Sequence, residues 1–449
     1  MYSYSNYKSS AKLIFSFLLL LCILALEKHV VSFVYILICI WALFGAKQAI
    51  KGLTINYVIL LLNPVVFKLP GEVSGLRWLV LFIAGLRVMP LVSRRVLYSL
   101  ISLLLFYLVV VVLAWMESPS FLISILKITM FTFGAGVFLI AFSCLDKSEL
   151  DDFRRWFFCL VAALMILSLP TLLIPRIGFA VNGSGFQGIL NHPQAFALFV
   201  VPIATYLIAD LLLKKERSSS WLWAIGALFS FLLYMSRART AMVTLFLSLG
   251  SAFVFASISS RKEKLDLAPV GSIMKIGMFA LLLATLTLLS PAFSESMSKF
   301  WLKGSNKSAT VGKAFSESRG KGIDYFWNRF LDKPLTGQGF GVEEGILTEK
   351  NVTTFLGIPI SATVEKGFLP AAFLEEVGII GMLLFLPFFL ALLYGATHTC
   401  DVRLMAMFFS CLFVNIGEAV FFSPGQIGGY LWLILGFTTC KGWSEANEK

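Results

Sequence analysis

Charged residues are scarce in this sequence. Only 14% of the 449 residues are charged, whereas 58% are hydrophobic. Soluble domains carry about 25% charged and about 45–50% apolar residues, and so few charges cannot shield this much apolar surface from water. The shortage of charge therefore excludes a soluble enzyme and a disordered or collagen-like chain. It predicts a protein whose main solvent is lipid.

Histidine and cysteine are too few or too scattered to build a metal centre or a disulfide framework. The three histidines, His29, His192 and His398, are scattered and show no ligand-type spacing to a second histidine or cysteine on the outer face. The seven cysteines all fall within apolar runs or at their ends, and none lies in the longest polar stretch. We expect no bound metal and no cofactor.

Apolar runs that approach the thickness of a bilayer recur along the whole chain. They lack the alternating pattern of a membrane barrel, so the sequence predicts an all-α polytopic membrane protein with about 12–14 transmembrane helices. The expected spans are 11–26, 29–45, 54–69, 76–91, 95–115, 121–144, 155–175, 193–213, 220–236, 240–259, 272–291, 368–395, 402–419 and 427–440.

Lysines and arginines concentrate in alternate short loops. About half of the 37 basic residues fall in one set of loops, such as those around Lys47, Arg94 and Arg154, while the alternate loops are poor in them. Cytoplasmic loops carry this excess in membrane proteins, so we expect both termini in the cytoplasm. Most of the net charge of +12 then records orientation and indicates no nucleic-acid partner.

One long polar segment interrupts the series of helices and divides the chain into three parts. Residues 1–290 carry the first eleven expected helices, 291–367 form a large loop outside the cytoplasm, and 368–449 carry the last helices. Within the loop, "GIDYFWNRFLD" places apolar residues at helical spacing and predicts an interfacial helix that ends before Pro334. The following "GQGFG" has neither the strand nor the Lys-Ser/Thr that a phosphate-binding loop requires.

Two arginines, Arg237 and Arg239, lie between strongly apolar helices on the side where basic residues are rare. A cation drawn into the bilayer costs at least about 2.5–3.5 kcal/mol unless it meets water, an anion or a partner. The pair either extends to the headgroups or holds an anion at the membrane surface. Since residues at i and i+2 of a helix point to different sides, an unwound turn is needed for both to reach one ligand.

Three further sets of residues are candidates on the same face. Basic residues of the large loop can bind an anion or form a solvated charged surface. The polar start of the 193–213 helix can bind sugar hydroxyls or act as a helix cap. The ionisable residues that open the 368–395 span predict a functional site, or are hydrated at the interface. The basic residues of the loop are Arg319, Lys321 and Arg329. The polar residues at the start of the 193–213 helix are Asn191, His192 and Gln194, and the ionisable residues that open the 368–395 span are Glu365, Lys366, Glu375 and Glu376.

Together these residues suit an anionic, lipid-linked glycan. Arginines can hold a pyrophosphate by bidentate contacts and stabilise it as it departs, while amides bind the saccharide. A carboxylate or a histidine can deprotonate the attacking hydroxyl.

The motifs "GILNHPQAFA", "SRARTA", "DKPLTGQGFG" and "LEEVGIIG", in this order over residues 180–390, resemble those of the O-antigen ligase and O-antigen polymerase superfamily of bacterial membrane glycosyltransferases. The resemblance implies a GT-C-type fold in the bacterial inner membrane. It also implies a metal-independent transfer, on the periplasmic face, of a glycan from undecaprenyl pyrophosphate to an acceptor sugar. Arg239 falls on the family's arginine, and Arg319 and Glu376 are the nearest matches to its other site residues.

Ligases of this superfamily typically place His-Asn about nine residues before the glutamate that Glu376 matches, where this chain has Gly367 and Phe368. Glu365 or Lys366 can replace that base, but the gap favours a polymerase of lipid-linked repeat units. The alternatives are a ligase that transfers the glycan to lipid A-core and, from another class, a lipid-linked oligosaccharide transporter, although no internal repeat is visible. A flippase and a chain-length regulator are the partners expected of a polymerase.

Overall fold

The computed structural model describes residues 30–67, 73–181, 183, 185–213, 220–263, 320–342, 352–355, 358–362, 366–398, 401–425 and 427–446. Nearly all of these residues are helical, as the apolar runs predict. The helices are α2 (Val30–Ala42), α3 (Ala46–Leu60), α4 (Val73–Val88), η1 (Met89–Leu91), α5 (Arg94–Glu117), α6 (Phe121–Ser143), α7 (Lys147–Ser168), η2 (Leu169–Leu173), α8 (Pro175–Gly178), α9 (Pro193–Leu213), α10 (Ser220–Met235), α11 (Arg239–Glu263), α15 (Lys321–Asp332), α16 (Leu369–His398), α17 (Val402–Phe413), η4 (Val414–Ile416) and α18 (Ile427–Ala446).

Within the described residues, six helices are long and apolar enough to cross a membrane: α5, α6, α7 with η2, α9, α11 and α16. Shorter apolar helices lie at Val31–Ala42, Trp223–Met235 and Val402–Ile416. The protein is therefore a multi-pass helical membrane protein. The expected spans 11–26 and 272–291 lie outside the described residues.

Two expected spans end earlier than their hydropathy suggests, and proline explains both. The run 54–69 is helical only to Leu60, because Asn63 accepts the backbone N–H of Val65 through its side chain and Pro64 disfavours helix in the residue before it. The run 155–175 leaves α-helical geometry after Ser168, where Pro170 opens the short 3-10 helix η2. The turn after α3 instead forms an isolated bridge from Leu62 to Leu190.

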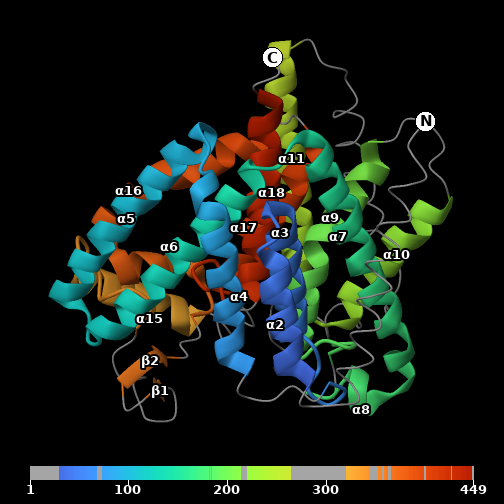
Figure 1. Ribbon diagram of the computed structural model, residues 1–449, viewed down its shortest axis with the longest axis horizontal. Coiled ribbons are helices and arrows are strands. Elements are labelled where there is room, and N and C mark those ends of the chain that lie inside the picture. Colours follow the sequence, from blue (N-terminus) through green and yellow to red (C-terminus); the bar gives the residue numbers. More distant parts are fainter. Residues whose placement is uncertain are drawn as a thin grey trace.

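The connections between helices gather at two ends of the bundle. The first, which we call the basic end, contains the turns after α2, η1, α6 and α16; there Lys47 lies 3.3 Å from Asp152, and Arg403 lies 2.9 Å from Asp210. The second, the site end, contains the turns after α3, α5, α8, α10 and η4 together with α15. These are the two sets of loops that the basic residues separate in the sequence. In Figure 1, α15, the strands and α8 lie on the lower side, away from the end of α18.

The large polar segment contains one short hairpin that hydropathy does not predict. Strands β1 (Val352–Phe355) and β2 (Ile358–Ala362) pair antiparallel, with a register irregularity between Thr353 and Thr354. The helix predicted in this segment is present as α15, which ends at Asp332, before Pro334. It packs against α16, so this part of the large segment lies on the bundle. Its place at the membrane interface stays a prediction.

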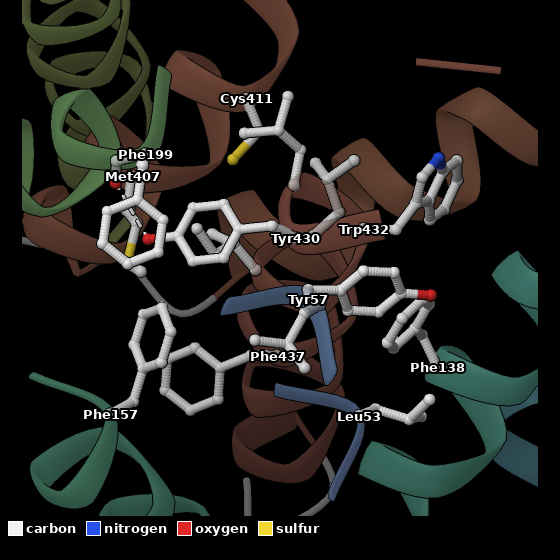
Figure 2. Packing of buried hydrophobic residues seen from close by; sticks show 14 of the residues in the cluster. Leu53, Tyr57, Phe138, Phe157, Phe199, Met407, Cys411, Tyr430, Trp432 and Phe437 are labelled. Carbon is white, nitrogen blue, oxygen red and sulfur yellow. Dashed lines mark hydrogen bonds between the residues drawn. The ribbon is translucent and has the colours of Figure 1, made fainter. Parts of the chain in front are cut away.

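Aromatic side chains from α3, α6, α7, α9 and α18 fill the centre of the bundle. Figure 2 shows Tyr430 among Phe199, Phe157 and Phe437; its ring centroid lies 4.4 Å from that of Phe199, whose carbonyl accepts its hydroxyl at 2.9 Å. Such a packed and hydrogen-bonded centre holds the helices in fixed positions. α16 packs on α5 and α18, and α17 on α9 and α11, so the helix ends that form the site end are firmly placed.

Candidate functional site at one end of the bundle

Helix α16 is broken near its start, and the segment 333–341 fills the break. At Gly378 the backbone has a φ of 61° and a ψ of −168°. The N–H groups of Ile379 and Ile380 donate to the carbonyls of Pro334 and Leu335 at 2.9 and 3.2 Å. The loop thus accepts bonds that an unbroken helix would make internally.

The exchange is reciprocal. The carbonyls of Glu375 and Glu376, which would accept Ile379 and Ile380 in a regular helix, accept the N–H groups of Gln338 and Gly339 at 2.7 and 3.1 Å. Backbone polar groups at membrane depth must be satisfied within the protein, and here four are satisfied by the loop. The glycines of "GQGFG" therefore allow the loop backbone to approach the backbone of α16 closely. This role needs neither the strand nor the Lys-Ser/Thr of a phosphate-binding loop.

A buried ion cluster holds α15, the loop and α16 together. The fully buried carboxylate of Glu375 lies 3.2 Å from Nε of Arg329 and 2.5 Å from Nζ of Lys366. The same ammonium lies 3.0 Å from Oε1 of Glu376. With two cations for two anions, the cluster is balanced in charge, which a low-dielectric position requires. Glu376 is thus ion-paired, and hydration at the interface does not describe it.

The ammonium of Lys366 is held in its charged form. Burial alone would lower its pKa, but the carboxylates of Glu376 and Glu375 more than offset this effect, so the pKa lies above its usual value. The ammonium also lies 5.4 Å from the ring centroid of Phe326 on α15. Lys366 therefore holds the carboxylates of Glu375 and Glu376 together. Whether it replaces the missing base stays a prediction.

Side chains from α5 and α6 fix the two ends of the loop. Glu117, the last residue of α5, accepts Nζ of Lys333 at 2.6 Å and the hydroxyl of Thr336 at 3.1 Å. Lys127, inside α6, donates to the carbonyl of Gly341 at 2.5 Å. Both were missed in the sequence. A single lysine within an apolar span was nevertheless a signal, because such residues rarely lack a function.

The unwound turn that the two arginines require is present. α10 ends at Met235 and α11 begins at Arg239, and between them Arg237 has a φ of 54°. A positive φ at a residue other than glycine is uncommon and typical of turns and functional sites. Arg237 is exposed and Arg239 half-buried. Whether both bind one anion stays a prediction.

The motif around His192 is built into the start of α9. Nδ1 of His192 accepts the N–H of Gln194 at 3.1 Å, which is the pattern of a helix cap. The N–H of Asn191 donates to the carbonyl of Leu61 at 2.7 Å and ties the motif to the end of α3. Nε2 of Gln194 donates to Oε1 of Glu418 at 3.0 Å. His192 therefore caps α9, and Gln194 bonds to the segment that precedes α18. Whether these side chains also bind sugar hydroxyls stays a prediction.

The segment 414–421, between α17 and α18, joins these motifs. Gly417 lies so close to Thr240, next to Arg239, that a Cβ at Gly417 would come within 2.2 Å of the threonine hydroxyl. Glu418 accepts Gln194, and Ala419 donates to the carbonyl of Lys366 at 3.1 Å. Sequence analysis missed this segment. Its signal was a single glutamate in a turn poor in basic residues.

The remaining predicted residues are only partly described. Arg319 and Glu365 lie outside the described residues, and Lys321 is the first residue of α15. Arg329 is held by Glu375, and its carbonyl accepts Nε2 of Gln338 at 2.8 Å. Among the residues that the structure describes, no group of three or more His, Cys, Asp or Glu side chains is arranged to hold a metal ion.

The fold and this site define a multi-pass helical membrane protein whose polar residues converge at one end of the bundle around a broken helix. No protein-family model and no curated protein matches the chain. The likeness to the O-antigen ligase and polymerase superfamily therefore rests on the motifs themselves.

Proposed function

We propose that the protein is a membrane glycosyltransferase that polymerises undecaprenyl-pyrophosphate-linked repeat units of a surface polysaccharide, either an O-antigen or an exopolysaccharide. The observation that carries the proposal is that motifs far apart in the sequence adjoin one another at the site end. Gln194 bonds to Glu418, Gly417 packs on Thr240, and Ala419 bonds to Lys366. These contacts link three of the candidate sets of residues through one segment.

Arg239 is the residue to which we assign the pyrophosphate. It is the first residue of α11, a helix of 25 residues, so its guanidinium and the helix N-terminus both favour an anion there. A guanidinium can hold phosphate oxygens in a bidentate manner. The exposed Arg237 in the preceding turn adds a second positive charge.

The proposed reaction transfers the growing glycan to the incoming repeat unit. A sugar hydroxyl attacks the anomeric carbon, the bond from that carbon to the pyrophosphate oxygen breaks, and the electron pair leaves with the undecaprenyl pyrophosphate. Arg239 stabilises the charge that develops on the departing group. We expect no metal to take part.

The ion cluster has a different task in this proposal. Because Lys366 and Arg329 neutralise Glu375, and Lys366 also pairs with Glu376, these residues hold the loop 333–341 and the start of α16 in place. Transfer then takes place on the side of Arg239, with the loop as one wall of the site.

In this proposal the protein lies in the bacterial inner membrane with its basic end in the cytoplasm and its site end in the periplasm. The excess of lysine and arginine at the basic end supports this orientation. A cysteine introduced at the exposed position Arg176 in α8 should react with a membrane-impermeant thiol reagent added to whole spheroplasts. Labelling that requires membrane disruption would reverse the orientation.

The deciding experiment uses purified full-length protein in liposomes with polyprenyl-pyrophosphate-linked repeat units extracted from membranes. A ladder of products from the lipid-linked repeat alone supports the proposal. Product that forms only after lipid A-core is added would make the protein a ligase. Movement of the lipid-linked glycan across the bilayer without any new glycosidic bond would make it a transporter.

A further inference from the structure

We infer that Arg77, near the start of α4, binds the phosphate group of a membrane lipid. This arginine lies in the expected span 76–91 and belongs to none of the candidate sets described above. A cation drawn into the bilayer needs water, an anion or a partner, and no carboxylate of the described residues pairs with Arg77. The inference requires no glycosyl transfer, so its test is separate from that of the proposed function.

The guanidinium of Arg77 lies among α2, α3 and the segment that precedes α18. It contacts the ring of Trp78, whose centroid is 5.0 Å from Cζ, and a Cβ at Gly425 would come within 3.8 Å of the same Cζ. Its positive charge acts on the hydroxyls of Tyr35 on α2 and Tyr57 on α3. None of these neighbours carries a negative charge, so they surround the cation without neutralising it.

Polar atoms at this place have no hydrogen-bond partner. Nε of Arg77 and the hydroxyl of Tyr35 are both shielded from solvent, and neither makes a hydrogen bond. The residue Tyr35 is fully buried, whereas Arg77 as a whole is half-buried. Buried polar atoms are nearly always paired in folded proteins, and an unpaired one is costly. The pair therefore indicates a ligand that accepts hydrogen bonds.

Asn56 of α3 adds a third polar side chain. It is fully buried, and neither its Oδ1 nor its Nδ2 makes a hydrogen bond. A Cβ at Gly52 would lie 3.4 Å from Ile38, which fixes the register of the antiparallel helices α2 and α3. Asn56 is one turn further along the same face of α3, so it lies beside the turn of α2 that carries Tyr35.

These donors suit a phosphate group. A guanidinium presents N–H donors in a fork that matches two phosphate oxygens. The hydroxyl of Tyr35 and the amide of Asn56 are neutral donors that can bind a phosphate oxygen without adding charge. One phosphate would thus neutralise the arginine and accept the hydrogen bonds of its buried neighbours.

The depth of Arg77 makes a lipid the source of that phosphate. Because α4 begins at Val73, at the site end, Arg77 lies about 6 Å along the helix at roughly 1.5 Å per residue. The adjacent Trp78 is a residue type enriched at the membrane–water interface. Further along α4, the exposed side chains of Phe82 and Leu86 meet the hydrocarbon. Arg77 therefore lies at the level of the lipid headgroups, whose phosphates are the anions present there.

The unpaired atoms determine how variants behave without lipid. Arg77→Met removes an unpaired cation and Tyr35→Phe removes an unpaired hydroxyl, so neither loses a hydrogen bond within the protein. Both should melt at the same temperature as wild type or higher in lipid-free detergent. A phosphate-bearing lipid should then raise the melting temperature of wild type more than that of either variant, because it stabilises only the folded state that binds it.

The test uses the full-length protein, purified in detergent and freed of lipid. The probe is dioleoyl phosphatidic acid; dioleoylglycerol is the same lipid without the phosphate, and inorganic phosphate is the free anion. Native mass spectrometry counts the lipid molecules that stay bound, and the melting temperature is followed in parallel. Arg176→Gln, which removes an exposed arginine from the same end of the bundle, is the matched control.

We expect wild type and Arg176→Gln to retain one molecule of phosphatidic acid more than Arg77→Met does. Loss of a charged hydrogen-bond donor should lower the affinity of this site about 10–100-fold, and Tyr35→Phe should lower it about 2–10-fold. Dioleoylglycerol should not be retained there. Inorganic phosphate should not raise the melting temperature at the concentration at which phosphatidic acid does.

Equal retention of phosphatidic acid by wild type and Arg77→Met overturns the inference. Retention of dioleoylglycerol to the same extent would show that the acyl chains alone bind, and a response to inorganic phosphate without retention of phosphatidic acid would show a site for a free anion. Either result also overturns it. A protein that retains this lipid through Arg77 but transfers no glycan would support the inference and reject the proposed function.

Discussion

Gly337 and Gly378 lie backbone against backbone, and each occupies space that a Cβ on the other would need. A Cβ at Gly337 would come within 2.7 Å of the nitrogen of Gly378, and one at Gly378 within 2.8 Å of the nitrogen of Gly337. Both have positive φ, 72° and 61°. The break in α16 and the loop that fills it thus depend on two glycines 41 positions apart in the sequence.

Replacing either glycine with alanine should destabilise the protein. A positive φ costs a residue with a Cβ roughly 1–3 kcal/mol, and the backbone contact adds to that cost. Gly378→Ala should therefore lower the melting temperature in detergent, and Gly337→Ala should do the same. The control is Gly250→Ala in α11, where nothing lies within 4 Å of the new Cβ. Equal melting temperatures in all three would refute the contact.

Removing the ammonium of Lys366 should be far more costly than removing that of Lys333. The side chain of Lys366 is 4% exposed and faces two carboxylates, whereas that of Lys333 is 40% exposed and faces one. Stranding a buried charge costs about 3–5 kcal/mol, while an exposed pair contributes at most about 1 kcal/mol. Chemical unfolding of Lys366→Met and Lys333→Met measures both, and similar losses would contradict the buried cluster.

The raised pKa of Lys366 sets the pH range in which it stabilises the protein. Since the folded pKa lies above the ordinary value of 10.5, its contribution is fully present below pH 10.5 and is lost as the pH rises through the folded value. The stability difference between wild type and Lys366→Met should therefore be constant at neutral pH and shrink only in strong alkali. A difference that falls between pH 7 and 9 would show that the ammonium is not held as described.

Arg239→Ala should abolish transfer while the protein still folds, and Arg239→Lys should recover little because a lysine cannot make the bidentate contact. The expected loss is on the order of 10²–10³-fold, as for removal of one donor to a developing anion. Arg176→Ala, which removes an exposed arginine from the same end of the bundle, is the matched control. Transfer at the wild-type rate in Arg239→Ala would remove Arg239 from the pyrophosphate site.

Transfer should survive EDTA. The proposed site stabilises its leaving group with arginine rather than a divalent cation. Liposomes treated with EDTA and then passed through a desalting column should retain their full rate of product formation. A rate that falls with EDTA and returns with Mg²⁺ but not with Na⁺ would contradict the arginine-based mechanism.

The helices were predictable because only a few backbone structures are stable within the hydrocarbon of a membrane. A backbone within hydrocarbon must satisfy its own polar groups, so a long apolar run is a helix, and α5, α6 and α9 lie where hydropathy puts them. The turn between α10 and α11 was also foreseeable, because the apolar runs 220–236 and 240–259 are separated by a segment that carries Arg237 and Arg239. Because of proline residues, α3 and α7 end earlier than the apolar runs that contain them.

The sequence identified several residues of the candidate site, but it did not predict which of them contact one another. Arg329, Lys366 and Glu375 stood out as charges beside a span, but no periodicity reveals that residues 46 positions apart bind each other. Glu418 and Lys127 escaped because each is a single charge in an apolar context, and its partner comes from a distant helix. The break at Gly378 was hidden for a similar reason, because the loop that stabilises it comes from another part of the chain.

The hydrogen bonds exchanged between loop 333–341 and α16 also constrain the order of biosynthesis. Four backbone groups of α16 can leave water only when the loop is there to receive them, and each costs several kcal/mol if left unpaired in hydrocarbon. The first turns of α16 can therefore settle in the membrane only after loop 333–341 has folded against them. Membrane insertion of this helix is thus coupled to the folding of a segment that precedes it in the chain.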